Sequence, residues 1–128
     1  MRREERAIGP DAFAGVDLRG RALLVHTGWS RHFGTPEYAQ GAPFLTRAAV
    51  DALVEAGVRF VGIDSVNIDD LEDWARPAHS VLLGAGIPVG EHFTGLDQLP
   101  PSGARLHAAP VKVRGMGTFP VRAYAVVP

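Results

Sequence analysis

The sequence contains no cysteine among its 128 residues. Disulfide bonds, thiolate zinc sites and cysteine nucleophiles are therefore excluded. The formal net charge is only −1, so the chain lacks the positive field that attracts nucleic acid or an anionic membrane. No apolar run approaches the roughly 18 residues that span a bilayer. We therefore expect neither nucleic acid nor a membrane among its partners.

Several catalytic signatures are also missing. The GAG and GMG segments lack the spacing and the lysine of a phosphate-binding loop, and no HExxH metal motif occurs. No GxSxG elbow supports a serine hydrolase. The first segment, MRREERAIGPDAF, is charged and lacks the apolar core of a signal peptide. We expect residues 1–18 to form a solvated lead-in and the protein to be cytoplasmic.

The apolar residues, 46% of the chain, suffice for one domain with a sizeable core. Residues 21–26 read as a buried strand between glycines, and residues 58–63 as a second strand. Thr46 and Gly57 mark the two ends of a helix between them, which predicts a βαβ unit with parallel strands. The core between this helix and the sheet is expected to contain Val50, Leu53, Val54, Val58, Phe60, Val61 and Ile63.

A second helix is predicted within residues 71–85, with Leu82 and Leu83 turned inward, followed by a strand over residues 87–93. Residues 105–114 and 120–127 predict two late antiparallel strands. The fold class is therefore α/β, with a mixed sheet and βαβ units.

The segment RPAHSVLLGAGIPVGEH places His79 on the predicted helix and Glu91 on the strand that follows. An imidazole and a carboxylate are good ligands for zinc or manganese when both reach the same ion. The glycine-rich turn between them allows that convergence. The alternative is that His79 packs the helix and Glu91 faces solvent.

Two loops are further candidates. The acidic segment Asp64–Asp70 follows a predicted strand and is expected to form a helix cap and turn, with Asp64 as the functional exception. The long loop over residues 30–43 is flanked by Trp29 and contains His32, and we interpret both side chains as lining a substrate pocket. The alternative is a loop held only by its aromatic side chains.

Four segments together resemble one family: LLVHTGW, APFLTRAAVDALVEAGVRFVGIDSVNID, AHSVLLGAGIPVGEHFTGLDQLP and LHAAPVKVRGMGTFPVRAYAVV. They are similar, in order, to the C-terminal part of the cyclase family, which includes bacterial kynurenine formamidase. The resemblance implies a swivelling β/β/α fold over residues 19–128. It also implies that His79 and Glu91 are ligands of a divalent metal, Zn or Mn.

The family's N-terminal motif, of the type HxGTHxDxPxH, does not occur in the sequence. That motif supplies the remaining ligands and the catalytic histidine, so no catalytic residue is assigned here. We expect an N-terminally truncated relative, whether from a truncated gene, a mis-called start or a divergent short protein.

The resemblance implies an arylformamidase-like hydrolase of the kynurenine pathway type, which acts on a small N-formyl amide or a related amide or lactone. As it stands the chain is expected to be incomplete, with metal weakly held or absent, and to form a homo-oligomer. The alternative is a non-catalytic pseudoenzyme, or a binding or assembly subunit, that keeps the scaffold.

Overall fold

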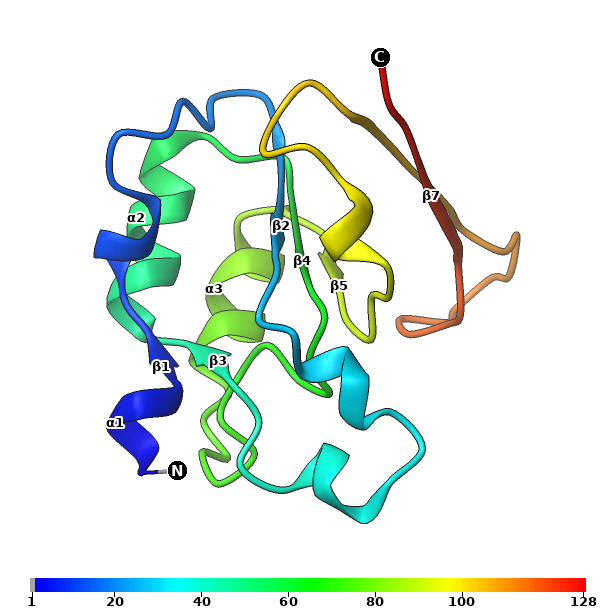
Figure 1. Cartoon of the computed structure of the whole chain (residues 1–128). Coiled ribbons are helices and arrows are strands. Elements are labelled where there is room, and N and C mark those ends of the chain that lie inside the picture. The colour runs from blue at the N-terminus through cyan, green and yellow to red at the C-terminus, as the bar shows by residue number, and fades with distance from the viewer. Residues whose placement is uncertain (1) are drawn as a thin grey trace. The chain divides into compact units, whose positions relative to one another are not determined.

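The computed structural model describes residues 2–128 (Figure 1), and the chain divides after Leu96 into two compact units. The first unit contains a parallel sheet of three strands in the order β2-β4-β5: β2 (Ala22–Val25), β4 (Phe60–Ile63) and β5 (Val89–Gly90). The predicted α/β class and the parallel pairing are therefore confirmed. The third strand is shorter than the predicted span of residues 87–93.

Helix α2 (Arg47–Ala56) follows the capping rules that predicted it. The Thr46 hydroxyl accepts a hydrogen bond from the Ala49 backbone N–H at 3.1 Å, and Gly57 closes the helix with φ of 77°. Only glycine takes that left-handed conformation without steric cost, so the end of the helix is encoded locally.

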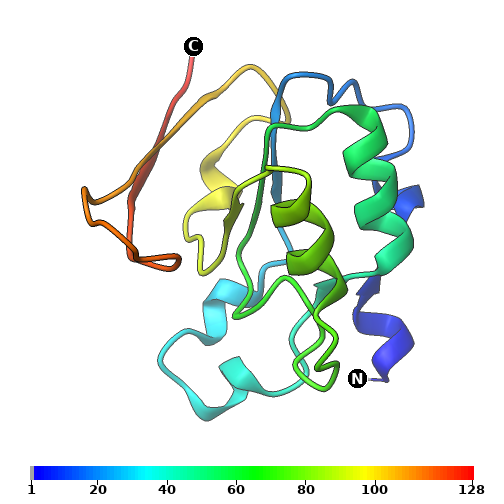
Figure 2. The same cartoon turned by 180° about the vertical axis from the view of Figure 1, so that it is seen from behind.

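Helices α2 and α3 (Pro77–Gly84) pack side by side on one face of the sheet (Figure 2). The core between these layers includes Val50, Leu53, Val58, Val61 and Ile63, as predicted, and Val54 packs at its margin. The prediction for Phe60 was wrong. Successive strand residues point to opposite faces, and the Phe60 ring instead meets Phe93 edge to face on the other side of the sheet.

Only one of the two leucines predicted to face inward from α3 does so. Leu82 is fully buried, whereas Leu83 is 55% exposed. Leu83 lies about 100° further around the helix than Leu82, outside the stripe through which α3 packs.

The first residues are not a simple solvated lead-in. A short helix, α1 (Arg3–Arg6), leads into β1 (Ala7–Ile8), which pairs in parallel with β3 (Phe44–Leu45). A 3-10 turn follows over Pro10–Phe13, and Leu18 is buried in the main core. The predicted lead-in missed this pairing because two-residue strands carry no periodic signal. The domain boundary after residue 18 stays a prediction.

The loop over residues 30–43 is more ordered than a plain surface loop. It contains a 3-10 turn at each of Trp29–His32 and Pro36–Ala39. The aromatic side chains of Trp29 and Tyr38 are buried together with Ala42 in a second, smaller cluster.

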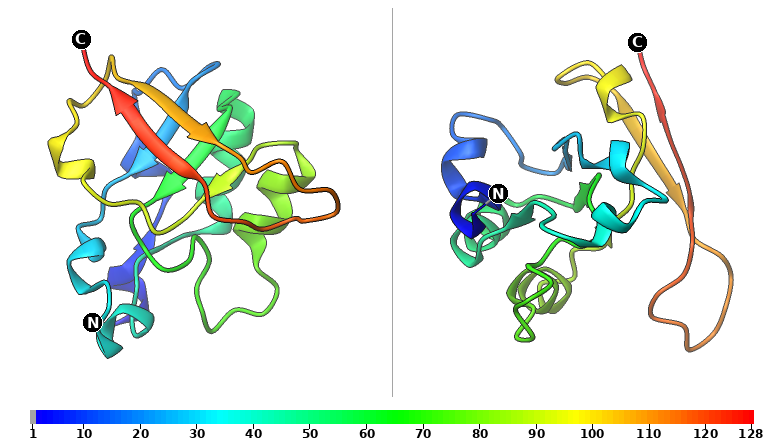
Figure 3. Two further views of the ribbon diagram at one scale, coloured as in Figure 1. Left: turned by 90° about the vertical axis from the view of Figure 1, so that its right-hand side faces the viewer. Right: turned by 60° about the horizontal axis from the view of Figure 1, so that its bottom comes forward.

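The second unit, Asp97–Pro128, contains the two late strands as an antiparallel pair, β6 (Arg105–Ala109) and β7 (Arg122–Val126) (Figure 3). Both are shorter than predicted. A 3-10 turn, Leu96–Gln98, lies where the two units join. Within residues 2–128, no helix is both long and apolar enough to cross a bilayer.

Replacing Leu82 by alanine should lower the free energy of unfolding by about 2–5 kcal/mol, because the fully buried side chain leaves a cavity. The neighbouring Leu83→Ala change should cost about 0.5 kcal/mol or less. Urea denaturation of both variants measures the difference. Equal losses would mean that the buried face of α3 is assigned incorrectly.

Candidate metal centre

Polar residues follow each strand of the parallel sheet at its carboxyl end. His26 follows β2 directly, Asp64 follows β4, and Glu91 follows β5. The carboxyl ends of parallel strands share one edge of a sheet, and this edge is where α/β proteins place functional groups.

The fully buried Asp64 carboxylate ties the ends of β2 and β4 together. Its Oδ1 atom accepts hydrogen bonds from the Thr27 backbone N–H at 2.8 Å and the Thr27 hydroxyl at 2.6 Å. Its Oδ2 atom accepts one from the Gly28 backbone N–H at 2.7 Å, with His26 Nε2 at 3.9 Å. Both oxygens are therefore occupied by the chain itself, which is a structural role.

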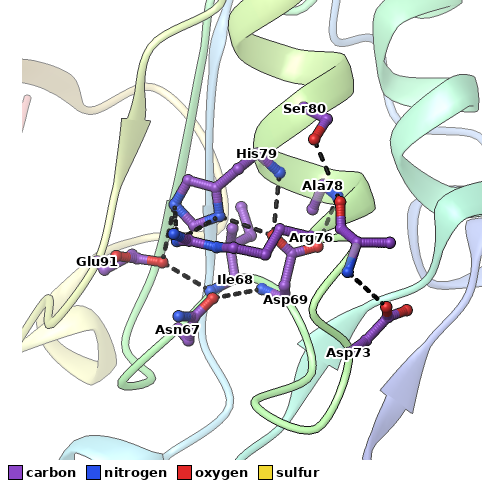
Figure 4. Close-up of polar contacts among 10 residues, drawn as sticks. Asn67, Ile68, Asp69, Asp73, Arg76, Ala78, His79, Ser80 and Glu91 are labelled. Carbon is purple, nitrogen blue, oxygen red and sulfur yellow. Dashed lines mark hydrogen bonds and ion pairs between the residues drawn. The ribbon is translucent and has the colours of Figure 1, made fainter. Parts of the chain in front are cut away.

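His79 and Glu91 meet at the same edge, as the sequence predicted (Figure 4). The Nε2 atom of His79 lies 3.4 Å from the Oε1 atom of Glu91, and the two side chains are 18% and 22% exposed. That distance exceeds the roughly 2.7–2.9 Å of a charge-assisted hydrogen bond. Two ligands bound about 2.0–2.1 Å from one tetrahedral zinc lie about 3.3–3.4 Å apart, so the spacing suits a shared ion.

The buried carboxylate of Asp69 holds His79 from the opposite side (Figure 4). Asp69 Oδ2 lies 2.7 Å from His79 Nδ1 and accepts the His79 backbone N–H at 3.1 Å. Its Oδ1 atom accepts the Ala78 backbone N–H at 2.6 Å. Burial raises the pKa of Asp69, but the hydrogen bonds from His79 and Ala78 outweigh it, so its pKa lies below the ordinary value.

The backbone N–H of Ile68, the residue before Asp69, holds Glu91. Ile68 donates its N–H to Glu91 Oε1 at 2.8 Å. Consecutive residues of the loop after β4 therefore orient the two candidate ligands, with Ile68 bonded to Glu91 and Asp69 bonded to His79.

Arg76 lies across the His79 ring. Its Nη2 atom is 3.1 Å from both ring nitrogens, which places it over the ring face rather than at the edge of either nitrogen. Arg76 also has a left-handed backbone with φ of 44°, immediately before Pro77.

His79 and Glu91 are suitable donors for a divalent metal, but they are fewer than a catalytic metal site needs. Among residues 2–128, no cluster of three or more His, Asp or Glu side chains has the arrangement to hold an ion. A catalytic zinc usually takes three protein ligands and an open position for water. Surface hollows of about 310 and 450 Å³ lie in the same unit, but neither is lined by His79 or Glu91.

The predicted pocket residues lie in the small aromatic cluster. Trp29 is buried and donates its indole N–H to the Tyr38 carbonyl at 2.9 Å, and its ring centroid is 4.5 Å from that of the half-buried His32. Their roles in a pocket stay predictions.

Sequence reasoning missed the contacts that two residues make beside the pair. Asp69 was treated only as part of a cap and turn, which it does provide for α3. Tyr38 places its hydroxyl 2.9 Å from Nδ1 of His92, the residue after Glu91. Burial, followed by the negative charges of Asp64 and Glu91, raises the pKa of Tyr38. No local pattern joins residues so far apart along the chain.

Comparison with known proteins identifies the family. The Cyclase family model matches residues 5–70. A kynurenine formamidase of Geobacillus thermodenitrificans (strain NG80-2) is 33% identical over 120 residues, which is 92% of this chain and 56% of that protein. The chain belongs to the cyclase family. It spans about half the length of the curated relatives that match most of it.

Two solved structures share the fold of the chain. An isatin hydrolase bound to the product analogue thioisatinate superposes with a TM-score of 0.86 at 24% identity, covering 95% of this chain and 53% of that one. A potential metal-dependent hydrolase with cyclase activity gives 0.80 at 27% identity, over 92% and 57%. The expected cyclase-like fold is therefore confirmed.

Replacing Asp64 by alanine should lower the free energy of unfolding by about 1–3 kcal/mol, because the N–H groups of Thr27 and Gly28 lose their acceptor. The exposed Asp51, paired with Arg47 one helical turn away, provides the control. Asp51→Ala should change the free energy of unfolding by only about 0.5 kcal/mol or less, because the exposed ion pair is weak and alanine favours the helix. Thermal or urea melts compare the two, and a neutral Asp64→Ala would contradict the structural role.

Proposed function

We propose that this chain supplies two ligands, His79 and Glu91, to the divalent metal of a cyclase-family hydrolase. The observation that carries the proposal is the 3.4 Å approach of His79 Nε2 to Glu91 Oε1. Each of these side chains is also held by a group on the loop after β4, so the approach does not depend on two freely moving side chains. Zinc and manganese are the metals that this donor pair suits.

The reaction proposed for the complete site is hydrolysis of an N-formyl amide or a related amide or lactone. The relatives support this class, since they are named kynurenine formamidase, isatin hydrolase and metal-dependent hydrolase. A bound divalent metal supplies Lewis acidity and an activated water in such hydrolases. The contribution of this chain is to hold the two ligands, and Trp29 and His32 are proposed as pocket lining.

The site that we propose is incomplete in this chain. Residues 2–128 offer two converging donors and no cluster of three, whereas a catalytic metal usually takes three protein ligands. Further donors would have to come from other residues, and a homo-oligomer alone repeats the same two. The shortage of donors is also what favours the alternative, a non-catalytic subunit that keeps the scaffold.

Zinc or manganese should bind the chain weakly, and both ligands should matter. Isothermal titration calorimetry should show that His79→Ala and Glu91→Gln each reduce affinity by about 10-fold or more, since each removes one of two donors. His107→Ala, which removes a half-buried imidazole of the second unit, is the matched control and should bind like the unmodified chain. Equal metal affinity in His79→Ala, Glu91→Gln and His107→Ala would contradict the assignment of the metal site.

Hydrolysis of N-formylkynurenine by the chain loaded with zinc or manganese should be close to the uncatalysed rate. The reason is that two protein ligands are fewer than the three that usually hold a catalytic zinc and its activated water. The assay follows substrate loss beside the His79→Ala variant. Robust turnover that disappears in that variant would show that the chain assembles a complete site.

A further inference from the structure

We propose that Asp69 is a positioning residue that sets which ring nitrogen of His79 carries the proton. The expected effect on metal binding rests on the function proposed above, whereas the expected tautomer of His79 does not. The observation is the 2.7 Å contact between Asp69 Oδ2 and His79 Nδ1, on the side of the ring opposite to Glu91.

The direction of the proton follows from the hydrogen-bonding capacity of the two groups. An ionised carboxylate has no proton to donate, so the proton in the 2.7 Å contact belongs to Nδ1. In the neutral ring, Nε2 is then left with its lone pair. That lone pair is directed to the side where Glu91 Oε1 lies 3.4 Å away. Asp69 thereby prepares Nε2 as an acceptor or a ligand.

Two backbone hydrogen bonds restrict rotation of the Asp69 carboxylate. Its Oδ1 atom accepts the Ala78 N–H at 2.6 Å, and its Oδ2 atom accepts the His79 N–H at 3.1 Å. These two bonds cap the start of α3, and they also hold the plane of the carboxylate against the imidazole. A cap needs only the backbone bonds, so the additional contact to Nδ1 is the feature that a purely structural role leaves unexplained.

The Asp69→Asn variant separates the two roles. The side-chain oxygen of asparagine can still accept the Ala78 N–H, which places its NH2 group against Nδ1. In this orientation the NH2 group also faces the His79 backbone N–H across the 3.1 Å contact, whereas the opposite orientation would set it against the Ala78 N–H across the shorter 2.6 Å contact. An NH2 group that donates to Nδ1 requires a lone pair there, so the proton moves to Nε2, where it blocks metal binding.

The measurement is a long-range proton–nitrogen NMR correlation of the His79 ring at a pH of about 8.5, where an ordinary imidazole is neutral. In the unmodified chain the protonated nitrogen should be Nδ1. In Asp69→Asn it should be Nε2. Asp70→Asn is the matched control: Asp70 is the adjacent buried carboxylate, but it bonds Arg3 at 2.6 Å. This control should keep the tautomer of the unmodified chain.

Two results would overturn the proposal. One is an unmodified chain whose His79 carries its proton on Nε2, which is decisive even if Asp69→Asn does not fold. The other is a folded Asp69→Asn variant with an unchanged tautomer.

A second arm measures zinc affinity, which should fall about 10–100-fold or more in Asp69→Asn but not in Asp70→Asn. This arm separates the two proposals. If zinc affinity is insensitive to His79→Ala, the proposed function fails while the tautomer result stands. If His79→Ala weakens zinc but Asp69→Asn leaves the tautomer unchanged, the role of Asp69 fails alone.

Discussion

The contact between the Asp69 carboxylate and the first turn of α3 is the interaction on which the arrangement of the candidate site depends. It satisfies two backbone N–H groups that a helix start leaves without partners, and it fixes the ring that projects from the same turn. The neighbouring Ile68 N–H fixes Glu91. One loop therefore connects the sheet, the helix and both candidate ligands, and its position is determined by the parallel pairing of β4 with its neighbours.

Backbone strain accompanies this arrangement. Within residues 2–128, Arg76 and His92 are the non-glycine residues with positive φ, at 44° and 60°. Such a conformation costs about 1–2 kcal/mol, and it persists where the surroundings hold it. Arg76 donates its N–H to the Asp73 carbonyl at 3.1 Å, and His92 donates its own to the Ser65 carbonyl at 3.0 Å. The two strained residues directly precede α3 and directly follow Glu91, so both lie beside the candidate ligands.

Features that depend on local rules could be predicted from the sequence. The cap at Thr46 and the glycine end of α2 follow from short-range patterns. The convergence of His79 with Glu91 was predicted from the helix–turn–strand order together with the family resemblance. The pairing of β1 with β3 and the contact of Tyr38 with His92 could not be predicted, because their partners are distant in sequence and leave no period. Phe60 and Leu83 were misassigned because a run of apolar residues does not say which face is covered.

The central claim is that one imidazole and one carboxylate of this chain share a metal ion. X-ray absorption spectroscopy of the zinc-loaded chain tests it most directly, because the scattering of the imidazole ring counts the histidine ligands. The account predicts one histidine nitrogen at about 2.0–2.1 Å, with the remaining positions filled by oxygen. A zinc shell with two or more histidines, or one that is unchanged in His79→Ala, would contradict it.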